Sequence, residues 1–468
     1  MRYVSTRGGA PVLEFDDALL AGLAADGGLY VPSAWPAISA GDLEAWRDLS
    51  YAELAVRVIS PFLGGRIGED DFAAMVEDAY AGFDHPDVAP LKQLEDGLWL
   101  MELFHGPTLA FKDYPMQLLG RLFDHVLSKR GERVTILVAT SGDTGSAAIA
   151  ACRDREAIDA FILYPHGRVT EIQRRQMTTV AAPNVHSIAI EGTFDDCQDL
   201  VKAMFNDRGF RDELKLSAMN SINWGRVMAQ TVYYVRAALR VAAPGQAVGY
   251  SVPSGNFGNV FAGYAAREMG LPVDRLVVAS NVNDILTRFF EAGDYSIAEV
   301  RPTLSPSMDI QISSNFERLL YDLYDRDGAA VAEAVATFRE TGRLDVGEAR
   351  WQKAREIFTG YRLDDEETKA TIREVWRATG ELLDPHSAIG VAAARAKRRD
   401  PATPMVALAT AHPGKFAEAV EAATGSKPEL PPALADLVAR PERLQVLAGE
   451  LGPVQDFIRA HVELQGAA

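Results

Sequence analysis

The pattern of apolar and polar residues changes near Leu98. Upstream, the stretches 51–62 and 69–80 repeat apolar residues at spacings of three and four, which predicts amphipathic helices. Breaks rich in glycine, proline and aspartate, "DGGLYVP" and "FDHPDVAPL", interrupt these patterns. We therefore expect the first ninety residues to form a mostly helical leading region, either a small domain or a lid.

Downstream of Leu98, short apolar runs alternate with longer amphipathic ones. This alternation is typical of parallel α/β sheets whose strands are joined by crossover helices. One such helix is "DDCQDLVKAMFND", 195–207, in which Cys197, Leu200, Val201, Met204 and Phe205 recur at helical spacing and predict a core-facing stripe. The predicted strands are 134–139, 160–164, 185–190, 248–252, 276–279 and 405–409.

The remaining patterns suggest how the chain is divided. The stretch 321–377 is polar and helical in pattern, and "PELPPALADLV" after Lys427 predicts a proline-marked connection followed by closing helices. We expect three units: the leading region 1–90, a small α/β domain 91–200, and a large α/β domain 201–468.

Composition and charge narrow the class of protein. The 468 residues are 48% hydrophobic and 24% charged, as in an ordinary globular chain. The formal charge of −18 disfavours nonspecific binding to nucleic acid or to an anionic membrane. No apolar run resembles a signal peptide or a membrane span. We expect a cytoplasmic protein with no nucleic-acid or membrane partner.

The chain contains two cysteines, Cys152 and Cys197, each within an apolar, helical pattern. The sequence has no C-x-x-C and no H-E-x-x-H. This favours two buried, reduced thiols over a disulfide or a metal site. We expect no metal and a reducing compartment.

Two glycine-bearing loops each leave a predicted strand and open a predicted helix, where backbone N–H groups and the helix dipole favour an anion. The first glycine loop, in "ATSGDTGSAA", surrounds a turn with hydroxyls that suit a carboxylate. Its residues are Thr140, Ser141, Gly142, Asp143 and Thr144. The second glycine loop, in "VPSGNFGN", has no lysine and would hold a phosphate by N–H groups. Its residues are Ser254, Gly255, Asn256, Phe257, Gly258 and Asn259.

Either loop alone could be no more than turn chemistry, and their recurrence in one chain favours a ligand. Other phosphate motifs fit less well. No G-x-G-x-x-G follows a predicted strand. In "AHPGKF", Ala409 stands where a P-loop needs its first glycine and Phe416 where it needs Ser or Thr. A nucleotide-binding protein is therefore disfavoured.

The stretch "LFHGPTLAFKDYP" places Lys112 beside Phe111 in an apolar setting. A lysine that loses hydration has a lowered pKa, and its free amine can form an imine with a carbonyl. Pyridoxal phosphate is such a partner, and it also carries a phosphate. The alternative is a surface Lys112 paired with Asp113, although Gly106 and Pro107 indicate a fixed loop rather than an exposed helix face.

Together with these segments, "GTFDDCQDLVKAMF", "NSINWGR", "LSPSMDIQISSNFERLL", "LDPHSAIG" and "TAHPGKF" resemble the threonine synthases of fungi and many bacteria. The resemblance extends to the N-terminal "YVSTRG" and "GLAADGGLYVP" and so covers nearly the whole chain. It implies an α/β, fold-type II pyridoxal-phosphate enzyme: two open parallel-sheet domains with a mostly helical N-terminal region. The cofactor is expected between the two domains.

By matching motif positions, the resemblance implies roles for single residues. Lys112 would carry the cofactor as a Schiff base, with Phe111 beside it. The second glycine loop would hold the cofactor phosphate, and Thr410 would meet the pyridine nitrogen with a neutral hydroxyl. The first glycine loop would receive the substrate carboxylate, with Asp143 where relatives of the fold often carry Asn.

The implied reaction is the last step of threonine biosynthesis, in which O-phosphohomoserine and water become threonine and phosphate. The substrate phosphate needs a separate cation, for which we favour Arg226 and, behind it, His105 and Lys415. The neighbours of Arg226 in this role would be Asn220, Ser221 and Asn223. An internal salt bridge of Arg226 is the alternative. His386 and His412 are expected to be structural.

Other functions remain open at this point. A dehydratase or phospho-lyase with the same lysine and loops would release a keto acid. A regulator without catalysis is disfavoured by the intact Lys112. The protein is expected to be a monomer or a homodimer.

Overall fold

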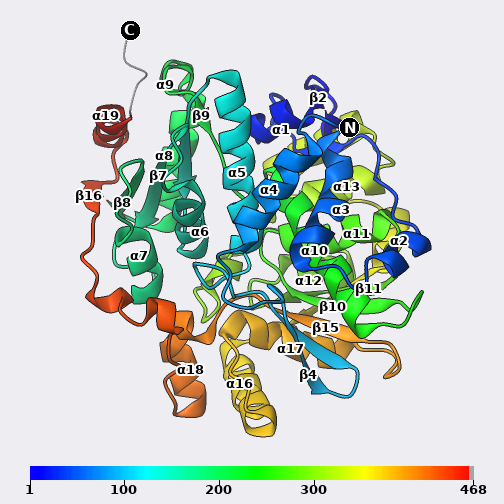
Figure 1. Ribbon diagram of the computed structural model, residues 1–468. Coiled ribbons are helices and arrows are strands. Elements are labelled where there is room, and N and C mark those ends of the chain that lie inside the picture. Colours follow the sequence, from blue (N-terminus) through cyan, green and yellow to red (C-terminus); the bar gives the residue numbers. More distant parts are fainter. Residues whose placement is uncertain (463–468) are drawn as a thin grey trace.

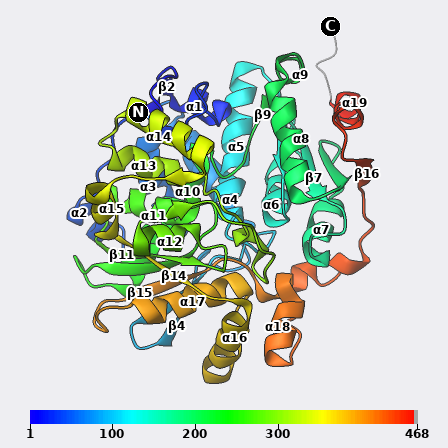
Figure 2. The same cartoon turned by 180° about the vertical axis from the view of Figure 1, so that it is seen from behind.

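The computed structural model describes residues 1–462 and contains two parallel sheets, which lie on opposite sides of helix α5 (Asp113–Arg130) in both views (Figures 1 and 2). The six-stranded sheet has the order β14–β11–β10–β15–β5–β4, with β4 as an antiparallel edge. Its strands are β4 Leu91–Glu95, β5 Leu98–Glu102, β10 Val248–Pro253, β11 Val273–Ser280, β14 Phe358–Arg362 and β15 Met405–Ala409.

Alternate residues of the six-stranded sheet enter two different cores. Leu276 and Val278 face the core shared with α10 (Trp224–Val241) and α11 (Gly258–Glu268). Val277 and Ala279 face the core shared with α16 (Asp365–Thr379) and α17 (Pro385–Lys397). This period of two buries both faces, as parallel sheets require.

The five-stranded sheet is parallel throughout and has the order β16–β8–β7–β6–β9. Its strands are β6 Val134–Ala139, β7 Ile158–Pro165, β8 Val185–Glu191, β9 Leu216–Ser217 and β16 Gln445–Ala448. The helices packed on it are α5, α6 Asp143–Cys152, α7 Glu171–Thr178, α8 Phe194–Asn206, α9 Arg208–Glu213 and α19 Leu451–His461. The C-terminal segment crosses from the six-stranded sheet to reach β8 (Figure 1).

The leading region combines four helices with a small antiparallel sheet of order β2–β1–β3. Its elements are β1 Arg2–Ser5, β2 Leu13–Glu14, α1 Phe15–Ala21, β3 Tyr30–Pro32, α2 Ala40–Ala45, α3 Tyr51–Leu63 and α4 Glu69–Tyr80. The sheet was not predicted, because strands of two to four residues are too short to show an alternating pattern. A capping box between Ser50 and Glu53 begins α3, and left-handed Gly64 ends it.

The remaining elements lie mostly between β11 and the C-terminal segment. They are α12 Ile285–Ala292, β12 Tyr295–Ser296, α13 Phe316–Leu323, α14 Gly328–Thr341, β13 Arg343–Leu344, α15 Glu348–Arg355 and α18 Ala417–Thr424. Short 3₁₀ turns occupy Pro306–Met308, Pro413–Phe416, Pro432–Leu434 and Leu437–Ala439.

The predicted helices 51–62 and 69–80 and all six predicted strands are confirmed. The apolar stripe of α8 is also confirmed, since Cys197, Leu200 and Met204 are buried. The helical interpretation of 321–377 was wrong at the two-residue strand β13 and, over a longer stretch, at β14. There Gly360 packs so closely on α12 that a Cβ would lie 2.6 Å from Thr287 Cα.

Cys152 and Cys197 are both buried and free, as expected. Within residues 1–462, no helix is long and apolar enough to cross a membrane. The predicted domain limits at 90 and 200 stay predictions. Strands β4 and β5 pair within the six-stranded sheet, while β16, from the far C-terminal part, pairs within the five-stranded one.

Candidate active site

The segment that carries Lys112 is held against the end of strand β15. Phe111 N donates to Thr410 O at 2.9 Å, and His412 N donates to Leu109 O at 3.0 Å, around an antiparallel bridge between Ala110 and Ala411. Leu109 has φ 60°, a conformation that is costly for a side chain of this kind. These contacts bring Lys112 and Thr410, almost 300 residues apart in sequence, to one place.

Lys112 is the residue before α5, and 9% of it is exposed. Its Nζ lies 3.3 Å from Asp143 Oδ2 and 4.7 Å from the centre of the Phe111 ring. The pKa of the Lys112 amine is lowered overall, and burial is the largest cause. The Asp143 carboxylate opposes this shift, whereas the charge of Arg226 adds to it. The predicted apolar setting of Lys112 is therefore present, with a carboxylate in addition.

Asp113, the next residue, does not form the surface pair with Lys112 that was the alternative interpretation. Its carboxylate accepts hydrogen bonds from Thr108 N at 2.8 Å and Thr108 Oγ1 at 2.6 Å. Burial raises the pKa of Asp113 to about 6. Asp113 fixes the turn that precedes Lys112.

Asp143, in the first turn of α6, is a fully enclosed carboxylate between two amines. Lys415 Nζ lies 2.9 Å from its Oδ1, and Gln173 Nε2 donates to the same oxygen at 2.9 Å. Burial opposes ionisation, but Lys415 and Lys112 hold the pKa of Asp143 well below its usual range. A permanent negative charge therefore lies next to Lys112.

The first glycine loop is closed by its own threonine. Thr140 Oγ1 accepts hydrogen bonds from Gly142 N and Gly145 N, both at 2.9 Å. Gly142 has φ 137°, and a Cβ there would lie 2.4 Å from Gln173, so only glycine fits. No described side chain caps the start of α6, which leaves N–H groups near Ser141 and Thr144 for an anion.

The second glycine loop lies between β10 and α11 and is held by the segment before α13. Asn315 N donates to Asn256 O at 3.1 Å, and Ser313 Oγ donates to Gly255 O at 2.8 Å. A Cβ on Gly255 would lie 2.8 Å from Ser307 O. The loop is therefore fixed from outside, and its N–H groups can remain free for a ligand.

Two residues of the second glycine loop turn their side chains into the core. Phe257, with φ 64°, stacks on Phe290 and meets Phe316 edge-on. Asn259 Oδ1 accepts from Tyr233 and Tyr234, while its Nδ2 is buried without a partner among the described residues. These residues would contribute main-chain groups to a ligand. No described side chain caps the start of α11, so N–H groups there are also available.

Thr410 is buried directly after β15, at the edge where open α/β sheets bind ligands. Its N–H donates to Ser387 Oγ at 3.0 Å, and its hydroxyl has no hydrogen-bond partner among residues 1–462. His386 lies behind it, between Asp384 Oδ1 at 2.8 Å and Ser307 N at 3.3 Å. These contacts fit a structural role for His386.

Arg226 is the third residue of α10 and is buried. Its Nε and Nη1 have no partner among the described residues, so the alternative of an internal salt bridge is wrong. Burial lowers the pKa of Arg226 to about 10. A buried guanidinium without an anion is costly, and this one lies near enough to Lys112 to lower the pKa of that amine.

The polar side chains that precede Arg226 differ in whether they are already hydrogen-bonded within the fold. Asn223 caps α10 through Gly225 N at 2.9 Å and donates to Leu19 O at 2.8 Å, so its side chain is committed to the fold. Asn220 Oδ1 accepts from Ile222 N at 3.2 Å. Ser221 O accepts from Asn315 Nδ2 at 3.1 Å, and the Ser221 hydroxyl has no partner among the described residues.

Both reserve candidates for the substrate phosphate are already paired. His105 contacts Asp84 at 2.6 Å and Glu102 at 2.9 Å; burial opposes its charge, but these carboxylates raise its pKa. Lys415 donates to Thr108 O at 2.6 Å besides its contact with Asp143. His412 accepts from Gly414 N at 3.1 Å, and burial lowers its pKa to about 4, which fits a structural residue.

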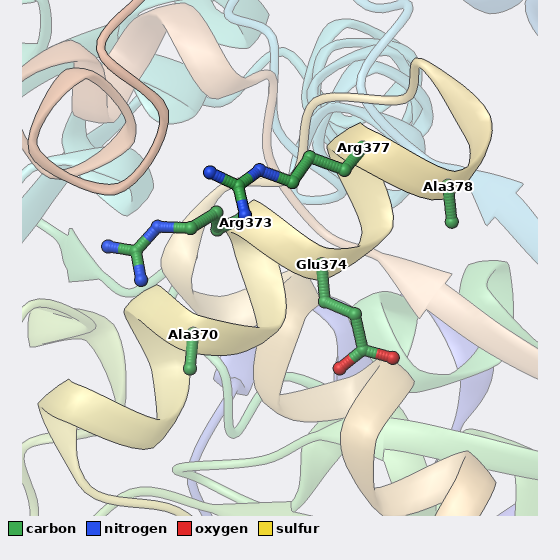
Figure 3. Close-up of a pocket in the computed structure, with 5 residues that line it drawn as sticks. All are labelled: Ala370, Arg373, Glu374, Arg377 and Ala378. Atoms are coloured by element: carbon green, nitrogen blue, oxygen red, sulfur yellow. The ribbon is translucent and has the colours of Figure 1, made fainter.

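A hollow elsewhere on the surface is separate from this site. Figure 3 shows it along a single helix, α16, where it is lined by Ala370, Arg373, Glu374, Arg377 and Ala378. None of the residues predicted for the site lies there. Arg373 is held by Ala423 O at 2.8 Å.

Sequence reasoning missed Gln173 and Asn315, which support the two glycine loops. Gln173 belongs to a capping box with Thr170 at the start of α7, a pattern that predicts a helix start but not a contact with Asp143. Asn315 follows two serines and carries no recognisable signal. Only the fold brings them to the site.

Comparison with known proteins gives matches along nearly the whole chain. Residues 2–80 match the model "Threonine synthase N terminus", residues 86–344 match "Pyridoxal-phosphate dependent enzyme", and residues 387–458 match "Threonine synthase, C-terminal". A threonine synthase of Pseudomonas aeruginosa is 58% identical, over 98% of this chain and 98% of that protein.

Two solved structures agree closely with this one. The pyridoxal-phosphate-bound threonine synthase of Brucella melitensis is 54% identical and superposes with a TM-score of 0.97, covering 99% of this chain and 100% of that one. Yeast threonine synthase is 38% identical with a TM-score of 0.93, covering 98% of each chain.

Proposed function

The chain belongs to the threonine synthase family, and from that premise we propose that Lys112 is the amine to which its pyridoxal phosphate is attached. The enzyme is a pyridoxal-phosphate-dependent lyase that converts O-phosphohomoserine and water to threonine and phosphate, the last step of threonine biosynthesis. One observation carries the assignment of Lys112: its amine is buried, has a lowered pKa, contacts Asp143 of the first glycine loop, and follows Phe111, whose N–H donates to Thr410 O.

The residues of the second glycine loop fit the cofactor phosphate. Their N–H groups lie at the start of α11, where no described side chain caps the helix, and the helix dipole favours a dianion. Gly255 and Gly258 allow the neighbouring segments to hold the loop closely, since a Cβ would lie 2.8 Å from Ser307 O at Gly255 and 3.1 Å from Asn315 Nδ2 at Gly258. We assign the phosphate to Ser254, Gly255, Asn256, Phe257, Gly258 and Asn259.

Thr410 is assigned to the pyridine nitrogen. Its free hydroxyl can donate or accept a hydrogen bond but cannot hold a proton on the ring as a carboxylate would. Bound pyridoxal phosphate supplies an electron sink for charge at the substrate carbons, and a neutral partner at the nitrogen moderates it. Phe111, at the side of the Lys112 amine, limits access of water.

Lys112 is the residue we assign to proton transfer. An amine with a lowered pKa is neutral at lower pH than an ordinary lysine and can therefore accept a proton. We propose that Lys112 moves protons at the α and β carbons of the substrate. Phosphate then leaves from the γ carbon, and water adds at the β carbon.

The substrate binds through its two anionic ends in this proposal. The carboxylate is assigned to the first glycine loop, where Ser141 and Thr144 offer hydroxyls beside the uncapped start of α6. Asp143 repels a carboxylate, so this assignment relies on main-chain and hydroxyl donors rather than on Asp143. The phosphate is assigned to Arg226, whose unpaired nitrogens need an anion, with Asn220 and Ser221 near it.

The product distribution tests the proposed function. Purified protein is supplied with pyridoxal phosphate and O-phosphohomoserine, and phosphate, threonine and 2-oxobutyrate are measured together. Equal amounts of threonine and phosphate support the proposal. Phosphate with 2-oxobutyrate and no threonine would instead identify a phospho-lyase or dehydratase that uses the same lysine.

The state of Cys152 and Cys197 is the basis on which we propose a cytoplasmic location. Both thiols are buried and free, which suits a reducing compartment. Cell fractionation with detection of the protein tests this, and recovery in a membrane or secreted fraction would contradict it.

A further inference from the structure

Lys415 is a buried cation that the steps above do not use. Only 1% of it is exposed, and its Nζ has two fixed acceptors, Thr108 O at 2.6 Å and Asp143 Oδ1 at 2.9 Å. An amine held in this way is poorly placed to receive an incoming anion. Its contacts are with the protein interior, and one of them is the carboxylate that also faces Lys112.

The Asp143 carboxylate contacts two amines, but only one of them can remain charged throughout the reaction. Lys112 lies 3.3 Å from Oδ2 and must be neutral whenever it attacks a carbonyl carbon or accepts a proton. A buried carboxylate that loses its only cation is strongly destabilised. The site therefore needs a second cation that keeps its proton.

We propose that Lys415 is the permanent counter-ion of Asp143, a positioning residue that allows Lys112 to lose its proton while Asp143 stays ionised and buried. The inference rests on the proposed function only in taking Lys112 as the reactive amine. Lys415 follows β15 of the six-stranded sheet and Asp143 follows β6 of the five-stranded sheet. The ion pair thus also fixes the two sheet edges across the site.

The charged groups near Lys112 determine what the loss of Lys415 does. Asp143 favours the ammonium form of Lys112, whereas Lys415 and Arg226 disfavour it. Asp113 also interacts electrostatically with Lys415, but its carboxylate accepts a hydrogen bond from Thr108 N. Without Lys415, Asp143 would be paired with Lys112 alone, and the ammonium form of Lys112 would become more stable.

The test measures the deprotonation midpoint of Lys112 in the apoprotein, from the pH dependence of its reaction with a trace amine-reactive label read by peptide mass spectrometry. We expect Lys415→Met to raise this midpoint by about one pH unit or more, because a like charge is lost. Lys415→Arg keeps the charge and is expected to change it little. Asp143→Asn is expected to lower it. An unchanged or lowered midpoint in Lys415→Met would overturn the proposal.

A second measurement applies if Lys415→Met does not fold. The double variant Asp143→Asn/Lys415→Met removes both charges and is expected to recover most of the melting temperature, since neither group is then buried without its partner. A double variant that stays unfolded while Lys415→Arg folds would show that only the contact with Thr108 matters, and would overturn the proposal. Neither readout uses threonine formation, so failure here is distinct from failure of the proposed function.

Discussion

The two glycine loops occupy equivalent places in the two parallel sheets but are built from different chemistry. The first contains a buried carboxylate, Asp143, that contacts Lys112 and Lys415. The second contains no charged residue and is held by hydrogen bonds from Ser313 Oγ and Asn315 N to its main-chain oxygens. Each follows a buried strand and begins a helix.

This difference matches what each loop is proposed to bind. A phosphate that keeps its charge throughout a reaction needs only fixed N–H dipoles, which have no pKa to perturb. A loop beside the amine that gains and loses a proton benefits from ionised groups that set the pKa of that amine. In this proposal the first glycine loop serves proton transfer as well as substrate binding, and the second serves retention of the cofactor.

The largest effect is expected from the buried amine that contacts the first glycine loop. Lys112→Ala removes both the point of cofactor attachment and the proton-transferring amine, so we expect turnover to fall by roughly 10³-fold or more. Lys129→Ala, an exposed lysine in the last turn of the same helix, is the matched control. Steady-state threonine formation measures both, and a Lys112→Ala enzyme within tenfold of wild type would contradict the assignment.

A change confined to the second glycine loop should weaken cofactor binding. In Gly255→Ala the new Cβ would lie 2.8 Å from Ser307 O, so the loop must shift. We expect roughly tenfold weaker binding of pyridoxal phosphate to the apoprotein, measured by absorbance titration. Gly82→Ala, where a Cβ meets nothing within 4 Å, is the control. Equal affinity in the two variants would argue against a phosphate at this loop.

A substitution of Arg226 tests whether this residue binds the substrate phosphate or the cofactor phosphate. Arg226→Met removes charge-assisted hydrogen bonds to the substrate phosphate, and we expect KM for O-phosphohomoserine to rise roughly 10- to 100-fold. Cofactor affinity should change little in the same variant. Arg240→Met, at the exposed end of the same helix, is the control. If cofactor affinity falls and KM does not rise, Arg226 belongs to the cofactor phosphate instead.

Asp113 is expected to give the smallest effect, on stability alone. Its pKa is raised from 3.8 to about 6 in the folded protein, so folding favours its protonated form. The contribution of Asp113 to the free energy of unfolding is therefore fully present below about pH 4 and is lost as the pH rises through about 6. The free energy of unfolding changes by about 3 kcal/mol at most over this range. In Asp113→Asn this contribution to the pH dependence of the melting temperature should disappear, whereas the exposed control Asp195→Asn should retain it.

Much of the fold was predictable because its signals are local. The six predicted strands are apolar runs bounded by turns, and α3 and α4 have a helical apolar stripe. Strand β14 was not predictable in this way, because its five residues include a glycine, Gly360, in place of an apolar side chain. The close packing of Gly360 on Thr287 is seen only in the folded chain. The short strands β1 to β3 depend on pairing between residues up to thirty apart.

The candidate site, like the fold, has parts that the sequence predicts and parts that it does not. Both glycine loops were predictable, since each combines a strand end, a glycine and a helix start. The contacts that set their electrostatics were not, because Lys415 lies more than 270 residues from Asp143 and Gln173 belongs to a different helix. That Arg226 Nε and Nη1 have no partner among residues 1–462 is likewise a property of the folded chain, since the sequence equally allowed an internal salt bridge.

The central claim is that Lys112, and not its neighbour Lys415, is attached to the cofactor. Reduction of the cofactor-loaded protein with borohydride fixes the attachment permanently, and peptide mass spectrometry then locates the modified lysine. The account predicts a pyridoxal-phosphate adduct on Lys112 with Lys415 unmodified. An adduct on Lys415, or an active enzyme with no adduct on Lys112, would contradict it.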